Sequence, residues 1–554
     1  MSPFTRPCSG LPTQSVRAIV RAHSAGITAL LICGLATTTA RATTYTVCPT
    51  GCNFSTIQAA LNSSSTTGNT ILVSAGTYRY ASEIAIADKD ASSPSAPTTL
   101  QADGQVIIDC ADPFGDSTWT QHSGNVYKAA RAPTLMTLPV SAGSVASQVH
   151  VDDVRYTFVD DTTYTTLAAG EWAYDTNTGL LYVRLVGGGS PASRQIYVGD
   201  KNRIRGLRVR RSNYFVIDGF TIKRATGAGI LIEGDQGANK DRISAINNCN
   251  ISQCWKQGMQ LSWTASAAVT NNTTHSNGDH GIQVILSDSA SITGNTSYLN
   301  DDPMEVRGGK TGIRIGNGVD STRVSDVNID YNVVHDNEDT GIDLLGARRI
   351  LVRRNLIYRN RDHGVDNNIT SRTVFINNVI FGNDHDGISV ENTSRRVAVF
   401  NNILMHNART VATLATPTAD IAEMTLLDTT EFVSNHNVFK PLPGTDIPGE
   451  GDSHDRHVVD LPSSGATYFD TFRGYQLTTG FDAVSDSTMP AFEDTAAFDF
   501  RLKSPGTTYA VDAARSDMTG WRSPMWLSVD PTGALPHNAN ESDIGVGSPS
   551  QAHS

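Results

Sequence analysis

Charged residues flank three glycines of this sequence at the same two offsets. Gly312, Gly341 and Gly364 each have one charged residue two positions before and one two positions after. The first glycine carries a cationic pair, whereas the other two carry only carboxylates. In chain order these residues are Lys310, Arg314, Asp339, Asp343, Asp362 and Asp366. If the three segments stack on one another, their side chains form a compact charged wall.

Four carboxylates in one wall repel each other. Two of them about 5 Å apart repel by roughly 3 kcal/mol at an effective dielectric constant near 20. They must protonate, splay into water or hold a cation, and Ca²⁺ prefers several carboxylate and carbonyl oxygens. We therefore predict a Ca²⁺ site whose ligands are Asp339, Asp343, Asp362 and Asp366. The alternative is that each is a turn aspartate that accepts hydrogen bonds from its own loop.

Candidates for a catalytic base lie beside these carboxylates. His363 immediately precedes Gly364, and Lys310 and Arg314 belong to the neighbouring segment. Arginine is a poor base because its pKa exceeds about 12. We expect Arg314 to bind a substrate carboxylate while Lys310 or His363 removes a proton. The alternative is that His363, as a histidine in a turn, has only a structural role.

The segment around Lys310 is longer than its counterparts. It reads NDDPMEVRGGKTG over residues 300–312, and excess loop on a rigid scaffold tends to carry binding or catalysis. Six arginines also gather between residues 348 and 361. We predict that substrate is bound by Asp302, Glu305, Arg307 and Arg348. The alternative for the arginines is the solvated face of one coil.

A repeat must position these residues. Between Gly229 and Gly387, seven glycines that are each followed by an aliphatic residue succeed one another at steps of 29, 23, 31, 29, 23 and 23 residues. A period in the twenties with one strand phrase per repeat and no helical period predicts an all-β solenoid of parallel strands. A series of asparagines recurs along with the glycines. It predicts an inward-facing ladder of side chains that form hydrogen bonds with backbone groups. Its members are Asn248, Asn272, Asn295, Asn332, Asn355, Asn378 and Asn402.

Five regions follow from these patterns. Residues 1–42 have the arginines, apolar stretch and small-residue cleavage site of a secretory signal. Residues 43–111 form an N-terminal cap, with a short helix at about 56–61, and the first coils. The period disappears over 112–200, where hairpin patterns predict an inserted antiparallel β subdomain. Regular coils occupy 201–410, and 411–554 contains irregular coils and a tail.

Bulk properties limit the partners. The formal net charge of −12 argues against nucleic acid, and no later apolar run predicts a membrane anchor. We expect a monomeric protein that is secreted or periplasmic. In an oxidising compartment Cys48 can pair with Cys52 and Cys249 with Cys254, which leaves Cys110 over.

The coils of about 23 residues, the NNVIFGN-type strands, the capping start and the FRLKSPGTTYAVDAA tail resemble the right-handed parallel β-helix superfamily of pectate lyases. GGKTGIRIGNG is similar to segments of exported polysaccharide lyases, and NRDHGVDNN is similar to a histidine-bearing coil of mannuronan C5-epimerases. The resemblance implies a right-handed β-helix that acts on an anionic polysaccharide.

The expected activity is cleavage of a uronate-containing polysaccharide by β-elimination, assisted by Ca²⁺. A C5-epimerase performs the same proton abstraction. A glycoside hydrolase would instead use two carboxylates among Asp339, Asp343 and Asp366. A non-catalytic glycan-binding or adhesin solenoid is the alternative outside the enzymes.

Overall fold

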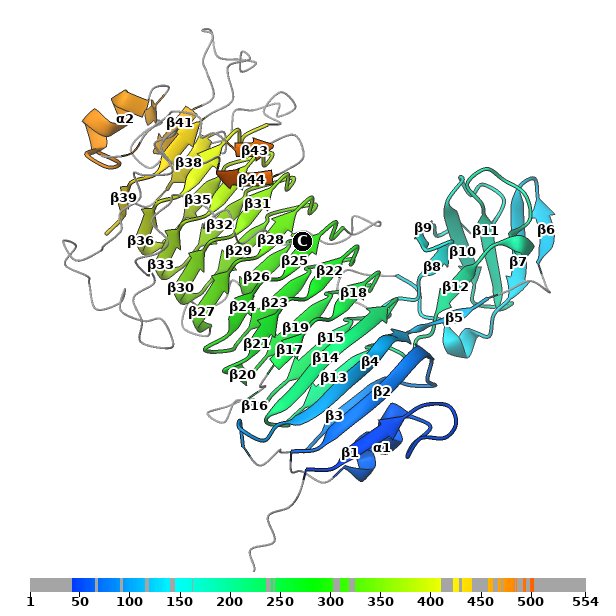
Figure 1. Cartoon of the computed structure of the whole chain (residues 1–554). Helices are drawn as coiled ribbons and strands as arrows, with labels where there is room; N and C mark the ends of the chain where they lie inside the picture. The colour runs from blue at the N-terminus through cyan, green and yellow to red at the C-terminus, as the bar shows by residue number, and fades with distance from the viewer. Residues whose placement is uncertain are drawn as a thin grey trace, which may run out of the picture. The chain divides into compact units, whose positions relative to one another are not determined.

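The computed structural model contains a long parallel β-helix (Figure 1). The residues that the structure describes are 42–64, 68–89, 93–114, 119–139, 145–161, 163–235, 241–242, 245–301, 309–317, 324–409, 422–427, 431–440, 457–461, 467–469, 472–483, 485, 492–494 and 499–502. The predicted signal at 1–42 therefore lies, except for residue 42, outside the described residues.

One 12-stranded sheet carries the repeated glycine phrases, and its strands are parallel except for the last pair. Neighbouring strands in it come from successive coils. In order they are β3 (Ile84–Ala87), β13 (Leu207–Arg210), β15 (Ile230–Glu233), β19 (Met259–Ser262), β23 (Ile282–Ile285), β26 (Ile313–Gly316), β29 (Ile342–Leu345), β32 (Val365–Asn368), β35 (Ile388–Glu391), β38 (Ala422–Leu426), β41 (His457–Leu461) and β42 (Thr467–Phe469).

A 20-stranded parallel sheet completes the coils. Each regular coil contributes two consecutive strands to it, separated by a bend. The long N-terminal strands are β1 (Thr44–Val47), β2 (Thr70–Tyr78), β4 (Thr98–Asp109) and β14 (Phe215–Lys223). The first strands of the later coils are β17 (Ala245–Asn247), β21 (Ala268–Thr270), β24 (Ser291–Thr293), β27 (Ser325–Asp330), β30 (Arg348–Arg353), β33 (Ser371–Ile376), β36 (Arg395–Phe400) and β39 (Val433–Asn435). The second strands are β18 (Asn250–Ser252), β22 (Thr273–His275), β25 (Thr296–Tyr298), β28 (Val333–His335), β31 (Leu356–Tyr358), β34 (Val379–Phe381), β37 (Ile403–Met405) and β40 (Val438–Lys440).

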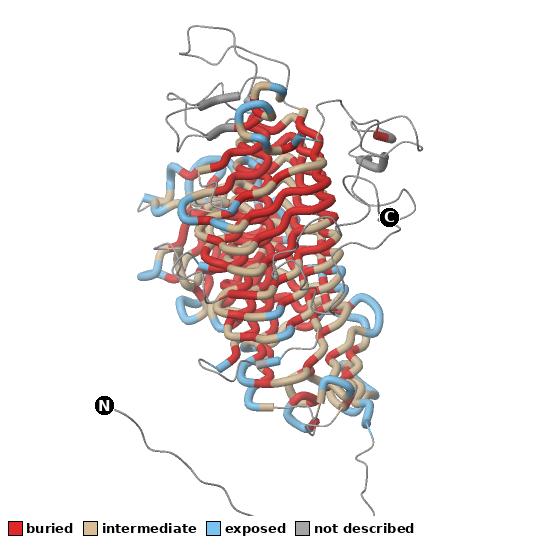
Figure 2. The backbone as a smooth tube through the Cα atoms, turned by 90° about the vertical axis from the view of Figure 1, so that its left-hand side faces the viewer, coloured by how far each residue is buried: buried red, intermediate tan, exposed pale blue. Residues whose placement is uncertain are grey.

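The core runs along the inside of the coils, and Figure 2 shows in red the buried residues of successive coils. Ile313, Ile342 and Val365, which follow three of the repeated glycines, are fully buried. The glycines themselves stand where backbones approach closely. A Cβ on Gly341 would lie 2.7 Å from both the carbonyl oxygen of Gly364 and the side-chain nitrogen of Asn360. Only glycine fits this column, which explains its periodic return.

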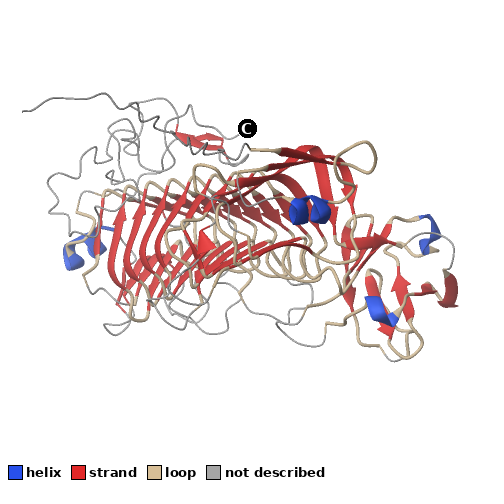
Figure 3. Cartoon of the chain, turned by 90° about the horizontal axis from the view of Figure 1, so that it is seen from below, coloured by secondary structure: helices blue, strands red, loops and turns tan. Residues whose placement is uncertain are grey.

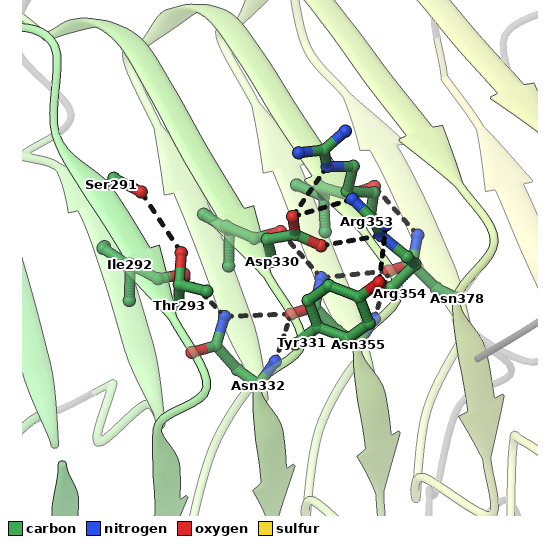
Figure 4. Close-up of polar contacts among 12 residues, drawn as sticks. Ser291, Ile292, Thr293, Asp330, Tyr331, Asn332, Arg353, Arg354, Asn355 and Asn378 are labelled. Carbon is green, nitrogen blue, oxygen red and sulfur yellow. Dashed lines mark hydrogen bonds and ion pairs between the residues drawn. The ribbon is translucent and has the colours of Figure 1, made fainter. Parts of the chain in front are cut away.

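Two asparagine ladders, rather than one, bridge the coils at the bends of the 20-stranded sheet. In the first, each side-chain oxygen accepts a hydrogen bond from the backbone N–H of the asparagine one coil earlier, at 2.8 to 3.0 Å. Figure 4 shows Asn332, Asn355 and Asn378 in it. Its members are Asn272, Asn295, Asn332, Asn355, Asn378, Asn402 and Asn437. The second ladder, which the sequence analysis missed, contains Asn277, Asn300, Asn337, Asn360, Asn383 and Asn407.

The predicted first rung of the ladder was wrong, and so was one predicted disulfide. Asn248 is exposed and bonds to Asp218. Cys249 takes its place, since its backbone N–H donates to Asn272 at 2.9 Å. Cys254 begins the second ladder in the same way. The two cysteines are both free and buried.

The separation of the ladders explains the two free thiols. Strand β18 lies between Cys249 and Cys254. Five residue steps in extended chain reach up to about 16 Å, far beyond the roughly 4.4–6.8 Å Cα separation of a disulfide. The predicted bond between Cys48 and Cys52 is present, and Cys110 is free and buried.

A short helix caps the first coil, as expected. Helix α1 (Ile57–Ser63) begins after Thr56, whose hydroxyl accepts the backbone N–H of Ala59. Its apolar residues Ile57 and Leu61 are buried in the core of the β-helix. A helix in this position covers the strand edges that an open coil would expose.

An eight-stranded sheet is inserted between β4 and β13. Its order is β5 (Ala111–Pro113), β12 (Ile196–Gly199), β8 (Val149–Val151), β9 (Val154–Phe158), β10 (Glu171–Asp175), β11 (Leu180–Arg184), β7 (Val126–Ala130) and β6 (Thr120–Ser123). All pairings are antiparallel except that of β9 with β10. The predicted hairpin turn at 177–179 joins β10 to β11. A separate apolar cluster around Trp172 forms its core.

The insert is attached to the β-helix by side chains from its β8–β9 hairpin region. Arg155 donates hydrogen bonds to the carbonyl oxygens of Cys254, Ser276 and Asp301, which belong to three successive coils. Asp153 accepts a hydrogen bond of 2.5 Å from Arg224. The hairpin therefore contacts the bends that precede β19, β23 and β26.

The remaining elements are short, and Figure 3 shows helices at few places among the strands. They are the 3₁₀ helices η1 (Pro133–Leu135) and η2 (Pro191–Ser193), the paired strands β16 (Asp241–Arg242) and β20 (Thr264–Ala265), helix α2 (Phe472–Thr479), and the paired strands β43 (Phe492–Asp494) and β44 (Asp499–Leu502). Within the described ranges, none of the helices has the length and apolarity to cross a membrane.

Candidate active site on the glycine-bearing sheet

Strand pairing places the residues two positions after the glycines in one column. Arg314 on β26 pairs with Asp343 on β29, and Asp343 pairs with Asp366 on β32. The column continues to Gln283 on one side and Ser389 on the other. This is the register expected from the glycine spacing. Because the residues before and after each of them are buried, and all of these except Asn367 are aliphatic, all five side chains point away from the core.

Arg314 and Asp343 form an ion pair at the centre of the column. One guanidinium nitrogen, Nη1, lies 3.0 Å from Oδ2 of the carboxylate. Burial raises the pKa of Asp343 to about 6, although the charge of Arg314 acts to lower it. The second oxygen, Oδ1, is buried and has no hydrogen-bond partner among the described residues. Asp343 therefore has one oxygen held and one available.

Asp366 lies on the next rung, where no cation faces it as closely. Burial, together with the charges of Asp343 and Glu391, raises the pKa of Asp366 well above its ordinary value. Its Oδ1 is also buried without a hydrogen-bond partner in the described part of the chain. The raised pKa favours the protonated form of Asp366, whose carboxyl group can then donate a hydrogen bond.

The turn before each glycine holds a second pair of carboxylates. Burial and the neighbouring Asp362 raise the pKa of Asp339 to about 7. Burial acts in the same sense on Asp362, but a hydrogen bond from His385 and the charge of His363 outweigh it, so the pKa of Asp362 falls below its ordinary value. Thr340 donates to Oδ2 of Asp362 at 3.2 Å. The environment has driven these two pKa values apart.

His363 lies among three carboxylates. Its Nε2 is 3.5 Å from Asp362 and 3.9 Å from Glu391, and its Nδ1 is 3.8 Å from Asp386. His385 occupies the turn of the following coil, and its Nδ1 is 2.7 Å from Oδ1 of Asp362. The two imidazole rings meet edge to face, with centroids 5.6 Å apart. His363 is thus joined to the carboxylates of its own and the next coil.

Lys310 does not face the four aspartates as expected. Its ammonium nitrogen lies 2.9 and 2.8 Å from the two oxygens of Glu338, and the side chain is buried. Burial and a hydrogen bond with Glu338 also raise the pKa of Asp301 to about 6. Lys310 therefore belongs to a second polar cluster beside the column.

The predicted substrate-binding residues are not gathered in one place. Asp302, Glu305 and Arg307 lie outside the described residues. Arg348 begins β30 in the 20-stranded sheet, past the bend that follows β29. It is therefore on another face of the coil from Asp343, because the chain turns between the two strands.

Most of the neighbouring arginines are paired with carboxylates of the preceding coil. Arg353 and Arg354 both bind Asp330, at 2.8 and 3.0 Å, as Figure 4 shows. Arg349 pairs with Asp326, and Arg359 with Asp336. A spacing of 23 residues aligns each of these acids with a base one rung later. The arginine cluster is for this reason largely neutralised within the protein.

Comparison with known proteins identifies the scaffold. The family model described as a right handed beta helix region matches residues 199–317 and 304–425. This chain is a right-handed parallel β-helix protein. No curated protein matches it in sequence.

Solved structures share the β-helix architecture at low sequence identity. The complex of XylC with xylose is 15% identical, with a TM-score of 0.51, over 74% of this chain and 77% of that chain. A glycoside hydrolase is 12% identical, with a TM-score of 0.48, over 66% and 95%. Pectate lyase Pel9A is 12% identical, with a TM-score of 0.44, over 91% and 96%. At 15% identity, the likeness to the XylC complex shows the fold alone.

The four aspartates of this β-helix do not fit the predicted Ca²⁺ site. Asp343 is paired with Arg314, and Asp362 is engaged by His385 and Thr340. In the described part of the chain, the group with ligand atoms within 4.8 Å of one another is Asp362, His363 and His385, which excludes the other three aspartates. A hard oxygen-preferring ion has no preformed set of carboxylates here.

Three acids of the site were missed by the sequence analysis. Glu391 ends β35 and accepts hydrogen bonds from Ser389 and Asn368 at 2.9 and 3.0 Å. Counting four positions past the last glycine, instead of two, would have found it. Glu338 and Asp386 sit in turns, where no column rule applies, and only the three-dimensional structure reveals their contacts.

Proposed function

We propose that this β-helix protein is a glycoside hydrolase that acts on a polysaccharide, with Asp366 as general acid and Asp343 as the partner carboxylate. The observation that supports it best is the pairing of these residues on adjacent rungs, each with one oxygen that no described residue binds. Burial raises the pKa of both carboxyl groups, but Arg314 opposes the rise at Asp343, whereas the charges of Asp343 and Glu391 add to it at Asp366. Asp343 would therefore be the ionised partner and Asp366 the protonated one. Glycoside hydrolysis requires one carboxylic acid and one carboxylate.

The spacing of the pair favours a retaining mechanism. Neighbouring parallel strands lie about 4.8 Å apart, and retaining glycosidases separate their two carboxyl groups by about 5–5.5 Å. Asp366 would protonate the leaving oxygen, while the free oxygen of Asp343 attacks the anomeric carbon to form a covalent glycosyl-enzyme. Arg314 would orient Asp343 and keep it ionised. Asp366, once deprotonated, would activate the water that releases the product.

A carbohydrate ligand also agrees with the xylose that XylC binds in the structure sharing this fold. We extend the class of ligand, and not the particular sugar, to this chain. The outward column of β23, β26, β29, β32 and β35 provides a repeated surface one strand apart, along which a polymer can lie. Export of the protein, inferred from the sequence, would bring it to such a polymer.

A polysaccharide lyase is the second candidate, and Arg314 favours it. Its buried Nε has no hydrogen-bond partner among the described residues, so a substrate carboxylate could bind there. Elimination also needs an unprotonated base. Among the described residues, Lys310 is held by both oxygens of Glu338, so His363 is the base we assign to this second candidate.

An assay of product chemistry tests the proposal. Purified protein is incubated with xylan, alginate, pectate, chondroitin, hyaluronan and glucuronan, and both reducing ends and ultraviolet absorbance are followed. We expect new reducing ends without the absorbance of an unsaturated uronate. Asp366→Asn should lower the rate by about 10²–10⁴-fold, the range for loss of a general acid. Asn250→Ala, which alters an exposed residue on β18 of the other sheet, is the control and should keep activity.

Three results would reject the hydrolase, and a fourth would reject the role of Asp366. An unsaturated product would establish the lyase instead, and a changed uronate ratio without chain cleavage would establish an epimerase. Full activity in Asp366→Asn would remove that residue from the acid's role. Binding of one of these polymers without turnover would mean a glycan-binding protein.

A further inference from the structure

Two histidines and an aspartate from adjacent coils converge beside the carboxylate column. Asp362 and His363 are consecutive in the turn before Gly364, and His385 occupies the corresponding turn one coil later. One ligand atom from each lies within 4.8 Å of the others. The repeat itself brings them together, because position 385 is 23 residues after position 362. Neither the hydrolase pair nor the Ca²⁺ prediction uses this group as a unit.

The contact distances fit a small tetrahedral ion. Oδ1 of Asp362 is 2.7 Å from Nδ1 of His385 and 3.5 Å from Nε2 of His363. In a four-coordinate site with bonds of about 2.0–2.1 Å, ligand atoms lie roughly 3.3 Å apart. The two distances bracket that value. Modest side-chain rotation would therefore place all three atoms on one ion.

The surroundings hold the ligands in orientation. Thr340 donates to Oδ2 of Asp362, which turns Oδ1 toward the histidines. On the far side of its ring, Nδ1 of His363 is buried, lacks a hydrogen-bond partner in the described chain and lies 3.8 Å from Oδ2 of Asp386. Asp386 is fully buried and its other oxygen accepts the backbone N–H of Ala422 at 2.8 Å. A carboxylate behind a histidine in this way is typical of metal-binding imidazoles.

We propose that Asp362, His363 and His385 bind a divalent transition metal ion, Zn²⁺ in the first instance. Two imidazoles with one carboxylate suit Zn²⁺ better than Ca²⁺, which prefers six to eight oxygens. Three protein ligands leave a fourth position for water or for a hydroxyl of a bound sugar. Unlike the hydrolase proposal, this inference concerns binding alone and stands or falls independently of turnover.

Metal titration of the full-length, tag-free protein tests the site. After treatment with a chelator and dialysis, the protein is titrated with Zn²⁺ in competition with a chromogenic chelator. We expect one ion per chain, and Co²⁺ in its place should show the visible bands of a four-coordinate site with nitrogen ligands. His385→Gln, in a half-buried position, should weaken Zn²⁺ binding by at least about tenfold, and Asp386→Asn by about 10–100-fold.

Matched variants separate this site from its neighbours. His406→Gln alters a histidine packed on Phe381 outside the group and should leave Zn²⁺ affinity unchanged, as should Asp366→Asn. The proposal is overturned if the wild-type protein binds no stoichiometric Zn²⁺, or if His385→Gln binds it as tightly as the wild type. Loss of the ion in Asp366→Asn but not in His385→Gln would also overturn it, because the ion would then sit on the aspartate column.

Discussion

At the scale of single residues, neighbours decide what an aspartate can do. Asp330 and Asp343 are both buried and both paired with arginine. Asp330 is bound by Arg353 and Arg354, which use both of its oxygens. Asp343 has one arginine and one oxygen without a partner among the described residues. The first is a structural ion pair, while the second retains the capacity to react.

The rate of the proposed hydrolysis should follow a bell-shaped pH profile. Asp343 must be ionised, so activity rises as pH increases through its pKa of about 6. Asp366 must be protonated, so activity falls as pH increases through its own raised pKa. The optimum lies between the two. Measurement of kcat/KM across this range gives both limbs, which belong to the free enzyme.

Arg314→Gln should move the acidic limb to higher pH. Arg314 lowers the pKa of Asp343 against the effect of burial, and loss of a close opposite charge raises a carboxyl pKa by about 1–3 units. The basic limb should move less, since Asp366 has no contact with this arginine among those found. Asn250→Ala, on the other sheet, serves again as control. An unmoved acidic limb in Arg314→Gln would show that Asp343 is not the group that titrates there.

Much of the site was predictable because a column needs only a spacing. Arg314, Asp343 and Asp366 follow from counting two residues past each glycine, and strand pairing bears out that register. Lys310 was assigned wrongly to the aspartates because its side chain is long and its partner, Glu338, lies in a turn. Counting residues from each glycine gives the strand and the column position of a residue. It does not give the direction of a flexible side chain or the contacts of a turn.

At the scale of elements, the asparagine ladders stabilise the bends by hydrogen bonds to the backbone. The side chain of Asn355 donates to the carbonyl oxygen of Ile329 and accepts the backbone N–H of Asn332, each at 2.9 Å. It is fully buried, so no water replaces these partners. The ladder was predictable from periodic asparagines, but its parallel second ladder was not recognised, and its first rung is a cysteine that no asparagine pattern contains.

Asn355→Ala should therefore destabilise the protein markedly. A buried backbone N–H and a carbonyl lose their partners, at about 1–3 kcal/mol each. We expect a lower apparent Tm and faster hydrogen exchange in the coils on either side of β31. Asn250→Ala is the control, because Asn250 is exposed on β18, and such surface changes usually stay within about 0.5 kcal/mol. Equal Tm values for the two variants would contradict a stabilising role of the ladder.

At the scale of the whole described molecule, the insert is joined to the coils through polar contacts of Gln148, Asp153 and Arg155. Arg155 alone reaches three carbonyl oxygens on successive coils. The sequence showed an interruption of the period, but it could not show this attachment, because the arginine and its acceptors are about 100 or more residues apart.

Arg155→Ala should loosen the insert without unfolding the coils. We expect faster hydrogen exchange and easier proteolysis at β8, β9 and the junctions near Ala111 and Gly199, while the core strands keep their protection. Arg194→Ala is the matched control, since this arginine of the insert pairs with Asp152 at an exposed position. An exchange pattern the same as that of Arg194→Ala would mean that other contacts, such as those of Gln148 and Asp153, attach the insert without Arg155.

The first asparagine ladder crosses two oversized coils without a break, and the 35-residue step from Asn402 to Asn437 is the second of them. Asn295 and Asn332 are 37 residues apart instead of 23, yet their hydrogen bonds have the same lengths as those of the neighbouring rungs. Extra chain can thus leave and rejoin the stack at this point while the rungs above and below stay aligned. Such a coil is a natural place for exchange during evolution or for grafting in the laboratory. Loops of different length and chemistry could be fitted beside an unchanged pair of aspartates, so that the reach and selectivity of the protein change while its backbone frame is conserved.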